Sequence, residues 1–224
     1  MRRFFGILSI LLGIAMIFGA VGLYLYNDHE DQQAQEAVDH YLPQVIQTIE
    51  DKIDVLKPTE SQTFEESQEL LTEIGETDEP EEDIIDPNYY STEMTIEIID
   101  GYGFIGYLTI PSLELQFPVL SETDDGRLKL SPCRFSGSTK TDNLVIGAHN
   151  YTRLFGKISS LRVGNEVHFT DMDGKLWSYR LASIETLQPN EGEILSNGEF
   201  PLTLYTCTYG GGSRLTLRFE LITE

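Results

Sequence analysis

The feature that most constrains this chain is an uncharged, mainly apolar run from Phe4 to Tyr26. A helix needs about 20 apolar residues to cross a bilayer, and this run is long enough. Arg2 and Arg3 precede the run, and acidic residues follow it from Asp28 onward. This distribution of charge, basic before the run and acidic after it, places the N-terminus in the cytoplasm and everything after the run outside the cell. The sequence therefore predicts a single-pass protein of the cell membrane with an extracellular remainder.

Two other kinds of segment could contain such a run. A cleaved signal peptide has an apolar core of about 7–15 residues followed by a small-x-small cleavage site. The present run is longer, and no convincing site of that kind follows it. A buried core helix fits less well because charged residues bracket the run on both sides. We therefore expect an uncleaved anchor over residues 1–27.

Acidic residues are concentrated between the apolar run and about residue 100, and they account for most of the net charge of −22. Apolar residues recur at helical spacing from Ala34 to Leu56. Pro43 interrupts this pattern, which predicts one kinked helix or two short ones. Residues 60–86 contain too little apolar surface to fold alone. Residues 28–88 are accordingly predicted to form a partly helical stalk that includes a flexible tether.

After about residue 89 the chain consists of short β-type runs separated by Gly, Pro, Asn and Asp, which is typical of an all-β barrel or sandwich. Residues 89–224 are large enough for one modest core. Acidic and basic residues are nearly balanced from residue 101 onward, and no basic stripe supports nucleic-acid binding. The predicted strands are Phe104–Ile110, Leu113–Leu120, Leu144–Gly147, Glu166–Thr170, Leu176–Ile184, Leu202–Thr206 and Arg214–Leu221.

The strand that begins at Leu202 ends in a cysteine. Alternation places Leu202 and Leu204 on one face with Thr206, and Cys207 on the other face at the strand end. The Gly-rich connection that follows lets the next strand pair with this one, which brings Arg214 near the thiol. Arg218 lies about 13 Å further along that strand. The alternative for both arginines is a solvated outer face.

His149 is the histidine best placed for chemistry. It follows an apolar strand at a strand-to-loop transition, where catalytic residues are often found. By contrast, His29 and His40 belong to the predicted stalk, and His168 alternates with apolar residues as an outward strand position.

These residues resemble the sortase family. Thr203-Leu204-Tyr205-Thr206-Cys207 fits the sortase signature Thr-Leu-x-Thr-Cys, and Arg214 follows at a spacing found in several sortase classes. Gly147-Ala148-His149-Asn150 resembles the segment that holds the sortase histidine, and the segment from Gly106 to Leu113 resembles the first barrel strand. The resemblance covers about residues 101–224. It implies a mainly β fold, a closed sortase-type β-barrel with short helices.

The resemblance also implies a function. Cys207 would attack a C-terminal sorting signal similar to Leu-Pro-x-Thr-Gly and form a thioacyl intermediate, which an amine of the cell wall or of a pilin lysine would resolve. His149 would transfer protons, and Arg214 would stabilise the oxyanion or hold the substrate backbone. Leu204, Thr206 and Asn150 are predicted to contact the substrate. No cofactor is predicted.

Two further segments and one group of acidic residues can be compared with features of the same family. Residues 192–200 correspond to its substrate-recognition loop. Residues 86–90, Asp-Pro-Asn-Tyr-Tyr, loosely resemble an Asp-Pro-aromatic lid, but the aromatic is displaced by one residue, which favours a Pro-initiated turn entering the barrel. Glu114, Asp124 and Asp125 are too few for a calcium site, so no metal is predicted.

Two alternative functions use the same residues. A cysteine peptidase would hydrolyse wall-associated peptides with Cys207 and His149, with water as the acceptor. A non-catalytic surface binding module would have Cys207 buried or joined to Cys133 in a disulfide, which an exported pair of cysteines allows. If no disulfide forms, Cys133 is expected to be a small apolar filler.

Overall fold

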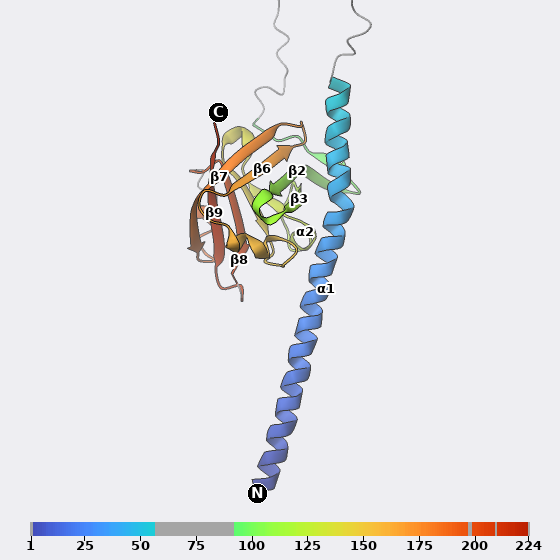
Figure 1. Cartoon of the computed structure of the whole chain (residues 1–224), viewed down its shortest axis with the longest axis vertical. Helices are drawn as coiled ribbons and strands as arrows, with labels where there is room; N and C mark the ends of the chain where they lie inside the picture. Colours follow the sequence, from blue (N-terminus) through green and yellow to red (C-terminus); the bar gives the residue numbers. More distant parts are fainter. Residues whose placement is uncertain (1, 57–91, 197–198, 209, 224) are drawn as a thin grey trace, which may run out of the picture.

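The computed structural model describes residues 2–56, 92–196, 199–208 and 210–223. A long helix, α1 (Arg2–Leu56), lies against one side of a β-barrel and extends well beyond it toward the N-terminus (Figure 1). The strands are β1 (Glu97–Ile99), β2 (Tyr102–Ile110), β3 (Leu115–Leu120), β4 (Cys133–Ser136), β5 (Leu144–Ala148), β6 (Glu166–Asp171), β7 (Leu176–Leu187), β8 (Leu202–Cys207) and β9 (Arg214–Leu221). Short helical turns connect them: η1 (Pro111–Leu113), α2 (Arg127–Leu130), η2 (Thr139–Thr141), η3 (Phe155–Ser160) and α3 (Gly192–Leu195).

The sheet closes on itself. Its strand order is β1-β2-β3-β4-β5-β8-β9-β7-β6, and a further pairing of β2 with β6 joins the two sides. Strands β2 to β9 therefore form a closed barrel, and β1 adds a short hairpin outside it. The predicted closed β-barrel is confirmed. The sequence did not predict β1 and β4, which have three and four residues and are too short to show a periodic pattern.

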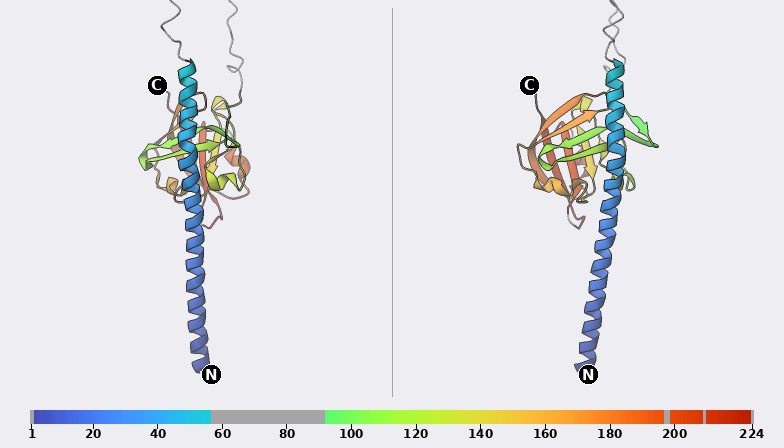
Figure 2. Two further views of the ribbon diagram at one scale, coloured as in Figure 1. Left: turned by 90° about the vertical axis from the view of Figure 1, so that its right-hand side faces the viewer. Right: turned by 45° about the vertical axis from the view of Figure 1, so that its right-hand side comes forward.

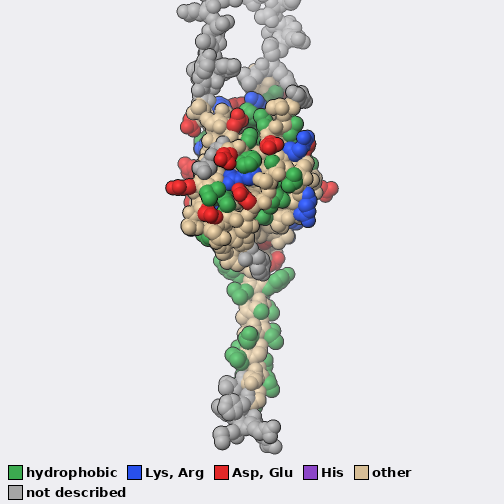
Figure 3. Space-filling view, turned by 90° about the vertical axis from the view of Figure 1, so that its left-hand side faces the viewer, with side chains coloured by type: hydrophobic (Ala, Val, Ile, Leu, Met, Phe, Trp, Pro, Cys, Tyr) green, Lys and Arg blue, Asp and Glu red, His purple; other side chains and the backbone are tan. Residues whose placement is uncertain are grey.

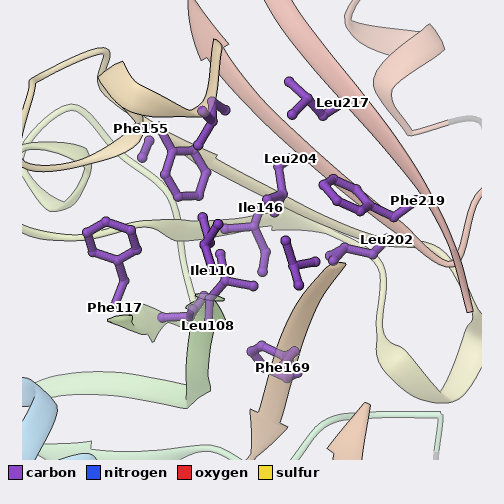
Figure 4. Packing of buried hydrophobic residues seen from close by; sticks show 14 of the residues in the cluster. Leu108, Ile110, Phe117, Ile146, Phe155, Phe169, Leu202, Leu204, Leu217 and Phe219 are labelled. Carbon is purple, nitrogen blue, oxygen red and sulfur yellow. The ribbon is translucent and has the colours of Figure 1, made fainter. Parts of the chain in front are cut away.

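Alternation along the strands fills the barrel. Leu202 and Leu204 of β8 and Leu217 and Phe219 of β9 are fully buried, and they meet Ile146 of β5 in the same cluster (Figure 4). Burying one large apolar side chain contributes about 1.5–3 kcal/mol. The barrel interior is thus a packed core, which leaves the strand ends and the outer face for a functional site.

Helix α1 runs unbroken through Pro43, so the expectation of two short helices was wrong. Proline removes one backbone donor, which leaves the carbonyl of Asp39 without its intrahelical partner. Both residues are exposed, and water can satisfy that carbonyl. On the opposite side, Val38 and Val45 are buried against the barrel and hold the helix on both sides of the proline.

The two halves of α1 have different surroundings. In the C-terminal half a helical stripe is buried (Ala34, Val38, Val45 and Ile49), and Tyr41 packs on the rings of Tyr102 and Phe104. In the N-terminal half the described apolar side chains are exposed along the length of the helix (Figure 3). Of the helices in the described ranges, this one is long and apolar enough to cross a membrane. The predicted tether at 60–86 and the possible lid at 86–90 lie outside the described residues.

Candidate active site

The pairing of three neighbouring strands brings the predicted catalytic residues together. Strands β5 and β8 are parallel, and Ala148 pairs with Thr206, so His149 and Cys207 follow side by side. Strands β8 and β9 are antiparallel, and Cys207 pairs directly with Arg214. Directly opposite residues in an antiparallel pair have Cα atoms about 4.5–5.5 Å apart. His149, Cys207 and Arg214 therefore share one end of the barrel.

A tight connection fixes the register of Cys207 and Arg214. Just beyond them, the Thr208 amide donates to the Ser213 carbonyl (2.8 Å), and the Gly211 amide donates to the Thr208 carbonyl (2.8 Å). Gly210 and Gly211 have φ of 87° and 73°, a backbone conformation that glycine adopts without strain. The Gly-rich segment thus makes the turn that places the guanidinium beside the thiol.

The two cysteines are both free thiols, so the predicted alternative of a disulfide is wrong. Cys133 is fully buried in β4, and its thiol donates to the Ser131 carbonyl (3.3 Å). Burial above all raises the pKa of the Cys133 thiol to about 12, so this thiol is inert at neutral pH. Cys207 is half-buried at its strand end and keeps a solvent-facing surface.

His149 is half-buried, and its ring stacks on Tyr151 with centroids 4.9 Å apart and planes at 24°. Burial is the main cause that lowers its pKa, and the positive charge of Lys129 adds to this effect. Within the described part of the chain, His149 Nε2 is buried without a hydrogen-bond partner. A proton there would find no acceptor, which also disfavours the charged ring.

Arg214 is half-buried, and its Nη1 donates to the Pro189 carbonyl at 2.7 Å. This contact ties the guanidinium to the start of the β7–β8 connection. An arginine has five N–H donors in a planar fork, so most of them stay available to a substrate oxygen. The position fits the predicted role of Arg214 beside Cys207.

Arg218, four residues along the same strand, has a different environment. It is only 6% exposed, so the alternative of a solvated face is wrong for this residue. Its guanidinium donates to Glu185 Oε1 (2.7 Å), to Thr203 Oγ1 (3.0 Å) and to the Ile194 carbonyl (2.8 Å). The β7–β8 connection covers it, a long-range contact that no local pattern signals. Arg218 thus joins β9 to β7, to β8 and to the β7–β8 connection.

The β7–β8 connection, which contains α3, lies over the outer face of β8. Its Leu195 packs with Val145 and Tyr205 beneath it. Gly147 allows this arrangement, because a Cβ at that position would lie 2.3 Å from Tyr205 Cζ. A cavity of about 240 Å³ opens beside the connection, lined by Ser183, Glu185, Ile194, Glu199, Phe200 and Arg218.

The three residues predicted to contact substrate lie in different places. Leu204 is fully buried in the barrel core, so its side chain cannot meet a ligand at the outer face. Thr206 is 3% exposed, and its hydroxyl donates to the Ala148 carbonyl (2.8 Å), which clamps β8 to β5 next to His149. Only Asn150 reaches the site surface, where Nδ2 donates to the Thr208 carbonyl at 3.5 Å. Leu204 and Thr206 therefore support the strands rather than contact a substrate.

Comparison with known proteins finds matches to part of this chain. The model of the sortase domain matches residues 108–220. Sortase A of Bacillus anthracis is 28% identical over 121 residues, which cover 49% of this chain and 54% of that protein. This chain thus spans about half the length of that relative.

Solved structures that match part of this chain include the following sortases. Sortase A from Corynebacterium diphtheriae has a TM-score of 0.49 and 21% identity, over 54% of this chain and 61% of that one. Sortase C1 from Streptococcus agalactiae has a TM-score of 0.49 and 25% identity, over 57% of this chain and 72% of that one. The family match extends over half of the sequence and includes the strands that hold His149, Cys207 and Arg214. The chain belongs to the sortase family.

Proposed function

We propose that this protein is a transpeptidase that cleaves a C-terminal sorting signal similar to Leu-Pro-x-Thr-Gly and transfers the acyl part to an amine. The observation that carries the proposal is the register of β5, β8 and β9, which sets His149, Cys207 and Arg214 at one barrel end. Family membership supports the same chemistry. The acceptor is an amine of a cell-wall precursor or a pilin lysine.

Cys207 acts as the nucleophile. Its thiolate sulfur attacks the scissile carbonyl carbon, and the carbonyl oxygen becomes an oxyanion. Collapse of this intermediate breaks the C–N bond and leaves a thioester on Cys207. The half-buried strand end allows a peptide to reach the sulfur, whereas the buried Cys133 is closed to it.

His149 carries the protons of both half-reactions. The leaving amine takes a proton from the imidazolium, and the incoming amine returns one to the neutral ring. Because burial lowers the pKa of His149, the neutral form dominates near pH 7.

Arg214 stabilises the oxyanion or the substrate backbone. A guanidinium is always charged and presents several donors at once, so it favours the negative oxygen more than the neutral carbonyl. The Pro189 carbonyl orients the group without neutralising it. Recognition of the peptide is assigned to the β7–β8 connection over β8, together with Asn150.

The N-terminal half of α1 is proposed to anchor the enzyme in the cell membrane with its N-terminus in the cytoplasm. Its exposed apolar side chains support this role, as do the basic residues before the run and the acidic residues after it. The barrel then works outside the cell, where sorting signals and wall amines are found.

The test is mass spectrometry of the full chain in detergent micelles, incubated with Leu-Pro-x-Thr-Gly peptides and an amine acceptor. We expect an acyl–amine product with the wild type and with Cys133→Ala, and none with Cys207→Ala. Hydrolysis that no amine alters would instead identify a peptidase. An unreactive Cys207 across several sorting peptides would contradict both enzymatic assignments.

A further inference from the structure

The juxtamembrane part of α1 contacts the loop that carries His149. The hydroxyl of Tyr151 donates to Glu30 Oε2 (3.3 Å), and the Arg153 amide donates to Asp31 Oδ1 (2.8 Å). The side chains of Glu30 and Asp31 are only 12% and 17% exposed, although both residues closely follow the apolar run. Two acidic residues of the predicted stalk are thus enclosed against the active-site loop.

Tyr151 connects this contact to the imidazole, on which its ring stacks. The loop around it is tight, because the amides of Leu154 and Gly156 both donate to the Tyr151 carbonyl (3.0 and 2.8 Å). A Cβ on Gly156 would come within 2.7 Å of that oxygen. These backbone hydrogen bonds hold Tyr151 in place, and the hydroxyl of its side chain donates to Glu30.

We propose that Tyr151 and Glu30 position the His149 imidazole, so that the anchor helix supplies part of the active site. The inference deepens the proposed function and rests on the catalytic role of His149. Neither residue touches the reacting atoms, since Tyr151 acts through its stacked ring and Glu30 acts through Tyr151. The sequence carries no signal for this pair, because its members are more than 100 residues apart.

Glu30 has a second partner, Lys129 of α2, whose Nζ lies 2.9 Å from Glu30 Oε2. The hydrogen bond from Lys129 is the main cause that lowers the Glu30 pKa, so this carboxylate is ionised at neutral pH. Burial chiefly raises the pKa of Tyr151, which therefore keeps its proton and remains a donor. Glu30 thus accepts from a neutral phenol and a cation at once.

The charges around His149 make the role of Glu30 measurable. The positive charge of Lys129 lowers the His149 pKa, and the negative charges of Asp125 and Glu30 raise it. The charged and titratable groups around the imidazole are Glu30 on α1, Asp125 just before α2, Lys129 on α2, Tyr151 in its own loop, Cys207 on β8 and Arg214 on β9. Removing Glu30 also leaves Lys129 without its partner.

Opposite substitutions should therefore move His149 in opposite directions. In Glu30→Gln the imidazole loses a nearby carboxylate and faces an uncompensated ammonium, so it titrates at lower pH. In Lys129→Met it loses the ammonium and titrates at higher pH. Shifts of opposite sign would show that both charges lie close to the imidazole, and the transfer rates below test whether the contact positions it. Glu36→Gln is the matched control, because Glu36 is exposed on the same helix.

The experiment is an NMR pH titration of the histidine Cε1–H signals of the full chain in detergent micelles. The chain has four histidines, and His149→Gln identifies the signal of interest. We expect the His149 midpoint to fall in Glu30→Gln, rise in Lys129→Met and stay in place in Glu36→Gln. Midpoints that agree with the wild type in both test variants would overturn the proposal.

Transfer rates give the second readout. Tyr151→Leu removes the stacked ring and should lower kcat about tenfold with little change in KM, because it misorients a proton carrier rather than removing a peptide contact. Tyr151→Phe keeps the ring but loses the bond to Glu30, and it should show a smaller loss. Wild-type rates in both variants would contradict a positioning role for Tyr151 and Glu30. The NMR titration does not require turnover, so a protein that transfers no peptide would refute the proposed function without deciding this one.

Discussion

The two ends of the β8–β9 hairpin differ in what covers them. At one end, Cys207 and Arg214 are half-buried and lie next to the β8–β9 connection. Four residues along, Thr203 and Arg218 pair in the same register and point to the same face, but they are 1% and 6% exposed. The β7–β8 connection accounts for this difference, because its backbone carbonyls and Glu185 enclose Arg218. The loop that covers part of a strand, rather than the strand pattern, therefore distinguishes the buried Arg218 from Arg214, which we propose to be catalytic.

This comparison predicts that the two ends of the hairpin affect different properties, the rate of transfer at one end and the stability of the fold at the other. Substitutions at the open end should change catalysis and leave unfolding nearly unaltered, whereas substitutions at the covered end should do the reverse. The four tests below run from the largest expected effect to the smallest.

The largest effect is expected at the open end. Cys207→Ala should lower the transfer rate at least about 10³-fold because no other accessible thiol can form the thioester. The midpoint of thermal unfolding should stay within the error of the wild type. A residual rate above one per cent, with the protein purified free of wild type, would mean that Cys207 is not the nucleophile.

The second largest effect is expected on stability, in the barrel core beneath the site. Leu204→Ala should destabilise the protein by about 3 kcal/mol, because it leaves a cavity among fully buried neighbours. Guanidinium unfolding followed by the fluorescence of Trp177, the single tryptophan, measures this effect. Leu176→Ala, at a position 61% exposed, should cost under about 0.5 kcal/mol. Equal losses in the two variants would contradict the assigned core.

The two arginines provide the sharpest contrast. Arg218→Met should cost about 2 kcal/mol of stability, because it leaves Glu185 and two loop carbonyls without their donor. Arg214→Met should change stability by under about 0.5 kcal/mol and lower kcat/KM about 10²-fold. If Arg218→Met alone lost activity at wild-type stability, the two roles would have to be exchanged.

The smallest effect concerns pH. Because burial lowers the His149 pKa below its usual 6.5, the unfolded chain takes up this proton more readily than the folded one. The contribution of His149 to stability is therefore complete above about pH 6.5 and is lost as the pH falls through the folded pKa. Compared with the wild type, His149→Gln should lose less stability between pH 7 and pH 5 in the same unfolding assay. Parallel pH curves for the two proteins would show that burial does not perturb this histidine.

Local patterns predicted most of the strands and singled out the three residues that we propose as catalytic. Alternation along Leu202–Cys207 set the face of the thiol, and the Gly-rich turn implied that Arg214 would return beside it. Contacts between distant segments were not predictable in this way. The burial of Arg218 depends on a loop more than 20 residues away, and the enclosure of Glu30 depends on a loop more than 100 residues away. Leu204 was assigned to the substrate from its place in the signature, although its alternation already pointed to the core.

The continuity of α1 has a consequence for how a transpeptidase of the proposed kind would find its substrate. From Tyr26, the end of the apolar run, to Glu30 the helix rises only about 6 Å, and the β8–β9 connection lies on the side of the barrel toward the N-terminal half of α1 (Figures 1 and 2). With that half in the bilayer, as proposed, the barrel stays close to the membrane instead of moving at the end of a long flexible linker. The barrel end with Cys207 and Arg214 would then lie just above the lipid headgroups. Peptides that are themselves tethered to the membrane would then be met by diffusion in two dimensions and at a high effective concentration.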